Sequence, residues 1–228
     1  MISNDGNVCE SLVIYDGHPF FVPSHSNIQA TEATYSRDIA AASNYGTICL
    51  PYAVESNENI QYYTTDEIEG GVLKLTKVTS VDAGKPAIFK KKDGGATEIT
   101  VAANNVSIAS DAGTNGSSVV LKGTFERITI GTDGVEGTGA ANGKYYINSS
   151  NQFCEGKDWF YVGAFRAYLE AAGKNARLTL QIDDEATAIS ELKTLDEKQG
   201  LKDGKYLIGG KIIVVKEGKQ YNVNGVIK

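Results

Sequence analysis

The chain has 228 residues, of which 41% are hydrophobic and 22% are charged, and its formal net charge is −6. This length and composition predict one large folded domain, with or without an appendage, and argue against wholesale disorder. The basic residues cluster only at Lys90–Lys92. Because phosphate binding needs a concentrated positive surface, we expect no nucleic-acid partner. No run of about 18 apolar residues occurs, so we expect no membrane-spanning segment.

The least polar stretch of the first half is residues 44–54. Apolar residues occupy both the odd and the even positions of this stretch, which predicts a strand buried on both faces. Pro51 has no backbone N–H to donate to a neighbouring strand, so this strand must lie at the edge of a sheet or bend there. Upstream, residues 12–15 fit a short strand. Residues 30–39 fit a strand, although Ile39–Ala42 also fits a helical turn, and we predict the strand.

From residue 59 onward, turn residues recur between short β-prone runs. Gly70–Gly71 between two such runs predicts a tight hairpin. Short strands spaced by about 8–12 residues are typical of a β-sandwich or a barrel. We predict an all-β fold, an antiparallel β-sandwich over residues 1–184. We expect its later strands at residues 60–65, 72–78, 87–90, 98–101, 106–108, 119–121, 125–130, 144–147, 151–154, 159–162, 165–169 and 176–182.

The remaining residues, 185–228, predict a linker followed by a β-hairpin or meander tail. Within residues 186–199, apolar residues at three-residue steps fit one short helix weakly. Glycine turns then separate three β-prone runs, which predicts a C-terminal β-meander. We expect its strands at residues 205–208, 211–216 and 219–223.

The chain contains three cysteines and two histidines. Cys9, Cys49 and Cys154 show no paired spacing for zinc or redox chemistry, so we expect Cys49 to be a buried apolar residue. The three are either free thiols or include one disulfide. Neither His18 nor His25 has a second histidine at metal-ligand spacing. We therefore predict no cofactor and no metal site.

Arg166 interrupts an otherwise apolar run between Phe165 and Tyr168. A guanidinium there is expected to be partly buried and to need a carboxylate or several carbonyl groups. We predict Asp183 or Asp184 as its partner. These two acids lack the spacing of a calcium loop, so a structural pair or a solvated turn is the better interpretation.

Adjacent aromatic residues occur at three places, Tyr62–Tyr63, Tyr145–Tyr146 and Trp159–Tyr161. Since neighbouring strand residues point to opposite faces, one member of each group is expected to face outward. We take Tyr62, Tyr145 and Trp159 as candidate binding residues, because exposed rings suit sugars or protein partners. Ordinary packing in the core or across strands is the alternative, and it accounts for more such residues in general.

No sequence feature points to catalysis. A Gly-x-Ser-x-Gly turn is absent, and neither histidine belongs to a recognisable nucleophile system. Two acids at glycosidase distance can come from any two strands, and nothing distinguishes a pair among the 28 acidic residues. We predict that the chain is not an enzyme and assign no catalytic residue.

Several segments together resemble a known kind of module. Taken in chain order, these segments resemble the C-terminal module of secreted and surface proteins of gut Bacteroidetes. That module is often found behind leucine-rich or adhesion-like repeats. The resemblance implies a non-catalytic extracellular or cell-surface β-module and supplies no catalytic residues. The segments that carry it are Asp16–Phe20, Ala33–Arg37, Gly46–Tyr52, Ala164–Leu169, Ile182–Asp184 and Gly210–Gly225.

From these observations we expect an adhesion or interaction role, with a protein or a glycan at the cell surface as partner. The alternative is a carbohydrate-binding module that uses its exposed aromatic residues. Met1 is the only methionine and no signal peptide is visible. We therefore expect Met1 to be an added start and the chain to be a piece of a longer protein.

Overall fold

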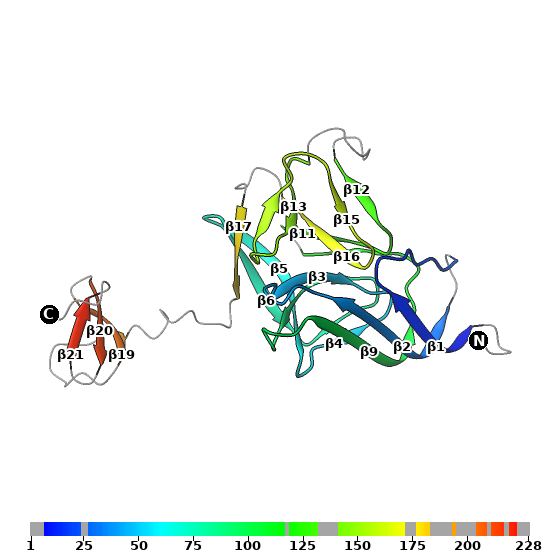
Figure 1. Ribbon diagram of the computed structural model, residues 1–228, viewed down its shortest axis with the longest axis horizontal. Helices are drawn as coiled ribbons and strands as arrows, with labels where there is room; N and C mark the ends of the chain where they lie inside the picture. The colour runs from blue at the N-terminus through cyan, green and yellow to red at the C-terminus, as the bar shows by residue number, and fades with distance from the viewer. Residues whose placement is uncertain are drawn as a thin grey trace. The chain divides into compact units, whose positions relative to one another are not determined.

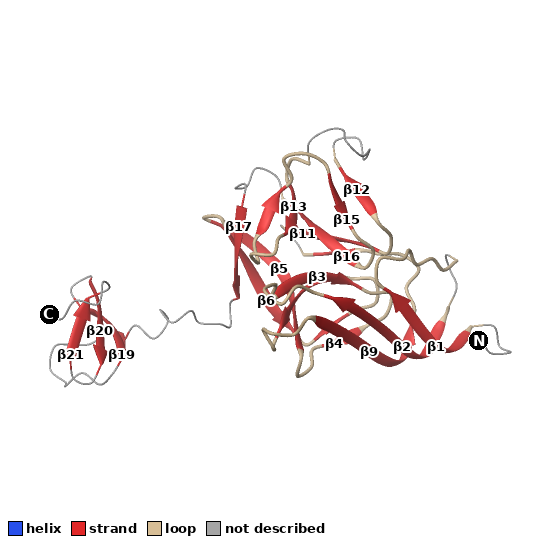
Figure 2. Cartoon of the chain, viewed as in Figure 1, coloured by secondary structure: helices blue, strands red, loops and turns tan. Residues whose placement is uncertain are grey.

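The computed structural model describes residues 7–23, 27–116, 119–131, 141–171, 177–182, 193–194, 204–208, 211–216 and 219–222. These residues form strands, turns and loops and contain no helix (Figure 1, Figure 2). The all-β fold class predicted from the sequence is therefore confirmed. The chain divides into two compact units, Met1–Asp183 and Asp184–Lys228.

The first unit contains a three-stranded sheet in the order β1–β2–β9. β1 (Val8–Tyr15) runs parallel to β2 (Gln29–Asp38), and β2 pairs antiparallel with β9 (Glu98–Ser107). The strand predicted for residues 30–39 is confirmed. The two strands predicted at residues 98–101 and 106–108 are one continuous strand, because β2 pairs along its whole length.

A ten-stranded curled sheet forms the rest of this unit's framework, in the order β10–β11–β16–β13–β14–β17–β6–β5–β8–β3 (Figure 1). Most of its neighbours are antiparallel, whereas β17 runs parallel to β6. Its strands are β10 (Thr114–Asn115), β11 (Val120–Thr124), β16 (Arg166–Glu170), β13 (Lys144–Ile147), β14 (Phe153–Glu155), β17 (Arg177–Ile182), β6 (Val72–Val78), β5 (Ile60–Glu69), β8 (Pro86–Lys91) and β3 (Tyr45–Cys49).

The predicted hairpin at Gly70–Gly71 is confirmed and joins β5 to β6. Both glycines have positive φ angles, 58° and 82°. A tight hairpin turn of this kind needs positive φ at both central residues, and glycine adopts it without steric cost. Two glycines in succession therefore set the register next to the turn, and an irregularity between Thr65 and Ile68 shifts it farther along the pair.

The curled sheet bends until its edge strand β3 meets β16. The backbone amide of Cys49 donates to the Phe165 carbonyl at 3.0 Å. Thr47 Oγ1 donates to the Ala167 carbonyl at 2.9 Å and accepts from the Ala167 amide at 3.0 Å. One hydroxyl thus satisfies both backbone groups of Ala167, so a side chain completes the pairing between the two strands. β3 is the last strand in the order of this sheet and ends at Cys49, so Pro51 follows an edge strand, as predicted.

Two cores lie against opposite faces of β5 and β8. Tyr62 and Phe89 pack with residues of the β1–β2–β9 sheet, which gives this part a sandwich arrangement. Tyr63 and Ile88 pack on the other side with residues of β6, β11, β13, β14, β16 and β17. Strands covered on both faces carry apolar side chains at successive positions rather than at alternate ones.

Two short strand pairs complete the unit, β4 (Val54–Glu55) with β7 (Ser80–Val81) and β12 (Ile128–Ile130) with β15 (Phe160–Val162). The strand predicted over residues 125–130 is shorter than expected. Thr124 Oγ1 donates to the Glu126 carbonyl at 2.7 Å and accepts from the Glu126 amide at 3.1 Å. This local bonding competes with strand pairing and delays the start of β12.

The second unit contains a four-stranded sheet in the order β18–β19–β20–β21. The predicted meander is confirmed, since β19 (Gly204–Ile208), β20 (Lys211–Lys216) and β21 (Lys219–Asn222) pair antiparallel in succession. β18 (Lys193–Thr194) runs parallel to β19 and falls inside the stretch for which one short helix was considered. Most of that stretch lies outside the described residues.

Candidate aromatic cleft and arginine cluster

A cavity in the described part of the first unit contains one of the three predicted binding residues. This cavity, the aromatic cleft, has a volume of about 640 Å³. Trp159, Tyr146 and Phe160 supply its aromatic side chains. Its remaining lining residues are Asn142, Cys154, Glu155, Gly156, Lys157, Asp158 and Arg177. The cleft therefore combines apolar rings with both hydrogen-bond donors and acceptors.

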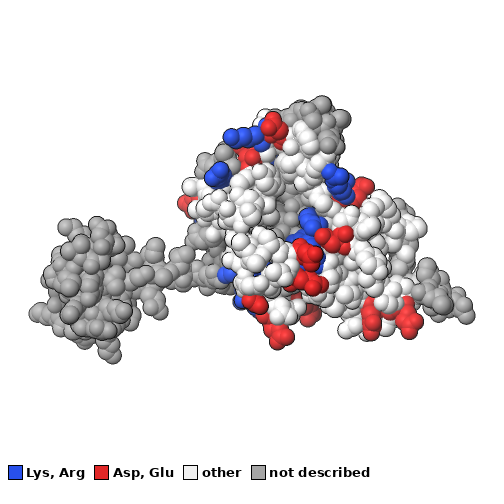
Figure 3. Space-filling model, viewed as in Figure 1, with Lys and Arg blue, Asp and Glu red and all other residues white. Residues whose placement is uncertain are grey.

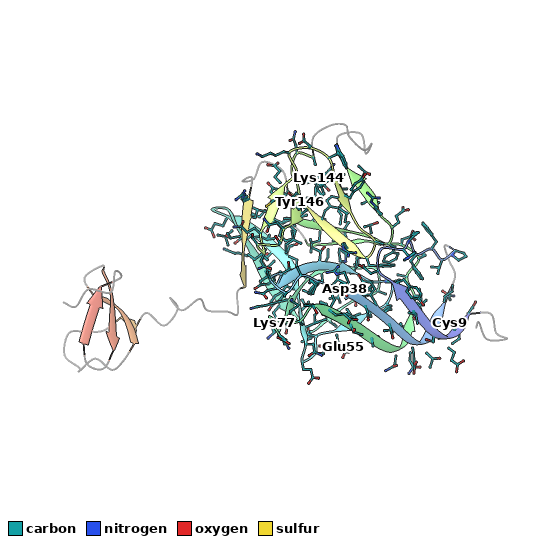
Figure 4. The ribbon with its side chains drawn as sticks, in the orientation of Figure 1. Cys9, Asp38, Glu55, Lys77, Lys144 and Tyr146 are labelled. Atoms are coloured by element: carbon teal, nitrogen blue, oxygen red, sulfur yellow. The ribbon has the colours of Figure 1, made fainter. Side chains whose placement is uncertain are left out.

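The cleft forms on the outer face of the β13–β14 hairpin. Tyr145 and Tyr146 point to opposite faces of β13, so Tyr145 is fully buried whereas Tyr146 is 41% exposed. Tyr146 lies opposite Cys154 of β14, and both side chains line the cleft. Figure 4 labels Tyr146 beside Lys144 on the same strand. Local strand alternation thus decides which ring of the pair is available to a ligand.

Aromatic contacts hold the rings of the cleft in place. The Tyr146 and Phe160 ring centroids are 5.1 Å apart with an interplanar angle of 50°. Trp159 meets Tyr161 edge to face at 5.0 Å, and the Arg127 guanidinium lies 3.5 Å from the Tyr161 ring centroid. Such contacts each add a modest stabilisation beyond area burial. These contacts therefore restrict the orientations that the rings can adopt.

Two carboxylates, Glu155 and Asp158, also line the cleft. Glu155 Oε1 accepts a hydrogen bond of 2.7 Å from the Gly143 amide, which orients its carboxylate. Lys157 and Arg177 add positive charges to the same lining. Acidic and basic side chains thus line the cleft together with the rings. A lining of this kind fixes the orientation of a polar ligand.

The prediction that Tyr62 and Tyr145 are exposed is wrong. Tyr62 and Tyr145 are both 0% exposed. Tyr62 is buried because β5 has a core on each face, so neither it nor Tyr63 faces solvent. Tyr145 is buried because the inward face of β13 carries it into the second core. Its neighbour Tyr146 is the exposed member of this aromatic pair.

The predicted burial of Arg166 is confirmed, but the acid that pairs with it is Asp16. Arg166 Nη1 and Nη2 donate to Asp16 Oδ1 and Oδ2 at 2.8 Å and 2.9 Å, and Nη1 also donates to the Ala164 carbonyl at 2.7 Å. Both side chains are 30% exposed. The predicted partners Asp183 and Asp184 lie outside the described residues. The loop after β1 supplies the carboxylate instead, from 150 residues away.

Tyr35 and Arg37 of β2 join this pair, and we call the four residues Asp16, Tyr35, Arg37 and Arg166 the arginine cluster. Tyr35 Oη donates to Asp16 Oδ1 at 2.6 Å. Burial tends to raise the pKa of Asp16, but the hydrogen bonds from Arg166 and Tyr35 and the nearby positive charges outweigh it. The net effect is a lowered pKa. Asp16 is therefore held in its charged form.

Burial lowers the pKa of Arg37 and raises that of Tyr35. Arg37 is only 6% exposed. Its Nη1 donates to the Thr47 carbonyl at 3.1 Å, and its guanidinium lies 5.0 Å from the Phe89 ring centroid. A Cβ atom at Gly46 would lie 2.6 Å from the Phe89 ring, so only glycine leaves room for this arrangement.

The three cysteines are free in this structure. Cys49 is fully buried, as predicted, and its Sγ donates to the Gly84 carbonyl at 3.3 Å. Burial raises the pKa of its thiol to about 12, so Cys49 stays protonated at neutral pH. Cys154 is half-buried and accepts a hydrogen bond from Asn148 Nδ2 at 3.1 Å. Among the described residues, no group of three His, Cys, Asp or Glu side chains is placed to hold a metal ion.

Comparisons with protein-family models, curated proteins and solved structures found no match for this chain. The resemblance to surface proteins of gut Bacteroidetes therefore stays a prediction. Within the residues that the structure describes, no helix has the length and apolar character needed to cross a membrane. Of the two histidines, His18 lies at the surface beside Tyr15, and His25 is outside the described residues.

Proposed function

We propose that this chain is a non-catalytic β-module of an extracellular or cell-surface protein, and that it acts by binding a glycan in the aromatic cleft. The observation that carries the proposal is the lining of that cleft. Three aromatic rings and several polar side chains converge on one cavity of about 640 Å³. Ligand sites typically combine apolar surfaces with a few placed polar groups in this way.

Sugars match this combination because they present an apolar C–H face and a ring of hydroxyl groups. The C–H face stacks on an amphipathic aromatic ring. The hydroxyl groups take hydrogen bonds from side chains such as Asn142 and Arg177 and donate them to Glu155 and Asp158. The extracellular assignment is supported by the sequence resemblance, which also favours an adhesion or interaction role.

A glycan array followed by calorimetric titration of the best glycan tests the proposal. The substitution Trp159→Ala should weaken binding about tenfold or more, because aromatic anchors at the centre of a site contribute most of the affinity. Tyr15→Ser is the matched control, since Tyr15 is an aromatic residue that is 68% exposed on β1 and does not line the cleft. It should leave the affinity unchanged.

Two outcomes would replace the proposal. Release of reducing sugar by the native chain, lost in Glu155→Gln, would make the cleft a glycosidase site, because Glu155 and Asp158 both line it. Absence of binding to every glycan tested would leave a protein partner as the target of the surface. Equal loss of binding in Trp159→Ala and Tyr15→Ser would place the glycan outside the cleft.

A further inference from the structure

A second cavity, separate from the aromatic cleft, lies between the β2–β3 connection and the turn of the β13–β14 hairpin. Its volume is about 280 Å³. Asn151 holds the two walls together, since its Oδ1 accepts hydrogen bonds from the Asn44 and Tyr45 amides at 2.7 Å and 3.0 Å. The walls are thus fixed to each other. The lining residues are Arg37, Asp38, Ile39, Ala40, Ser43, Tyr45, Gly46, Thr47, Ile147, Asn148, Ser149 and Arg166.

Two guanidinium groups of the arginine cluster line this second cavity, those of Arg37 and Arg166. Arg37 is held in position before any ligand binds, by its hydrogen bond to the Thr47 carbonyl and by its contact with the Phe89 ring. The absence of a side chain at Gly46 gives Arg37 Nη2 its place, because a Cβ there would lie 2.9 Å from it. The positive groups of the cavity are therefore preorganised.

The two guanidinium groups of the second cavity are paired with acids unequally. Asp16 pairs with Arg166 through both of its oxygens. Asp16 attracts Arg37 only from beyond ion-pair distance, and no other Asp or Glu of the described residues lies within that distance of the Arg37 guanidinium. Arg37 is nevertheless 6% exposed, so its charge is largely removed from water. An arriving anion would offset this desolvation, whereas a neutral ligand would not.

Asp38, labelled in Figure 4, is the acid among the lining residues of the second cavity, and it is exposed. In the space-filling view, basic and acidic side chains gather near the centre of the face shown, over the region of β3 (Figure 3). The hydroxyl groups of Ser43 and Ser149 line the cavity as well and add neutral donors. The buried part of the lining is thus positive, and its rim carries one negative charge.

We propose that the second cavity binds an acidic group, a carboxylate or a sulfate, carried by a small ligand such as an acidic sugar. Arg166 uses three of its five N–H donors for Asp16 and Ala164, so the remaining donors of the two guanidinium groups can bind the oxygens of either anion. The serine hydroxyls complete the set of donors from the opposite walls. This site does not depend on the aromatic cleft.

Calorimetric titration of the full chain with glucuronic acid, glucose 6-sulfate and glucose tests the proposal. The two acids should bind, with affinity that falls as salt rises, and glucose should not. Ser149→Asp, which adds a carboxylate to the rim, should weaken binding about two- to fivefold. Asp38→Asn, which removes one, should strengthen it by a similar factor. Comparing the two acids tells which anion the cavity prefers.

Glu32→Gln is the matched control for Asp38→Asn. It removes the same charge from an exposed position on the same strand, about 20 Å away for six extended residues. It should leave the affinity for the acids unchanged, as should Trp159→Ala in the aromatic cleft. The proposal is overturned if neither acid binds, if glucose binds equally well, or if both rim substitutions leave the affinity as it was.

Discussion

The arginine cluster and the aromatic cleft lie in the same unit, but they are assembled from different parts of the sequence and leave their side chains in different states. The residues of the cluster span 150 positions, from the loop after β1 to the start of β16. Most of the cleft comes from residues 142–160. The cluster ties its polar groups to one another, whereas the cleft leaves ring faces and carboxylates open.

This difference separates the side chains that hold the fold together from those on which a glycan can stack. Asp16 receives hydrogen bonds from Arg166 and Tyr35, so it joins the loop after β1 to β16 and β2. The rings of the cleft pack on each other at the surface, so their loss costs contacts on one side only. Stability should therefore depend strongly on the cluster and weakly on the cleft, and binding of a glycan should show the reverse order.

The largest effect is expected from Arg166→Met. This substitution leaves the Asp16 carboxylate, of which 70% is buried, without its cation. We expect the free energy of unfolding to fall by about 2–3 kcal/mol in urea denaturation. Lys122→Met is the control, because it removes a cation from the exposed pair with Glu170 on the neighbouring strand, and it should cost less than about 1 kcal/mol. Equal losses in the two variants would contradict a structural role for the cluster.

A smaller effect is expected when pH is lowered. The folded-state pKa of Asp16 is below its ordinary value of 3.8, so its contribution is fully present above that value and is lost as pH falls through the lowered pKa. The stability gap between the native chain and Asp16→Asn should be about 1–2 kcal/mol at pH 7. It should narrow below about pH 4, as measured by urea denaturation across pH. A gap that stays constant down to pH 2 would mean that the charge of Asp16 contributes nothing.

The smallest effect is expected from Tyr146→Ser in the cleft. Tyr146 is 41% exposed and contacts Phe160 across one face. Its loss should lower the free energy of unfolding by less than about 1 kcal/mol, which is the scale of one cross-strand pair. Thermal unfolding of Tyr146→Ser and of Arg166→Met, measured under the same conditions, checks which variant loses more stability. A larger loss for Tyr146→Ser would make the cleft part of the framework and reverse the comparison.

The features that sequence could predict were local ones. Alternation and paired glycines located the β5–β6 hairpin and the C-terminal meander, because such turns fix strand pairing over a few residues. The β-prone runs at residues 144–147 and 151–154 located the hairpin on which the cleft forms. The boundary of β12 was misplaced because a threonine side chain bonds the backbone two residues away, a competition that hydrophobic pattern does not record.

The features that sequence could not predict depend on which strands become neighbours. A strand with one solvent face would expose either Tyr62 or Tyr63, but β5 lies between two cores and buries both. The need of Arg166 for a carboxylate followed from its apolar surroundings, yet the identity of Asp16 followed from the fold alone. Arg37 gave no sign of lining a cavity, because its burial results from β3 and Phe89 closing over it.

The hydroxyl bridge from Thr47 to Ala167 can form only late in synthesis, because the ribosome makes β3 long before β16. The two residues are 120 positions apart. At a translation rate of about 5–20 residues per second, β3 emerges roughly 6–24 s before the strand that covers its edge. Throughout that interval the nascent chain carries an open β edge, which is the kind of surface that aggregates or recruits a chaperone.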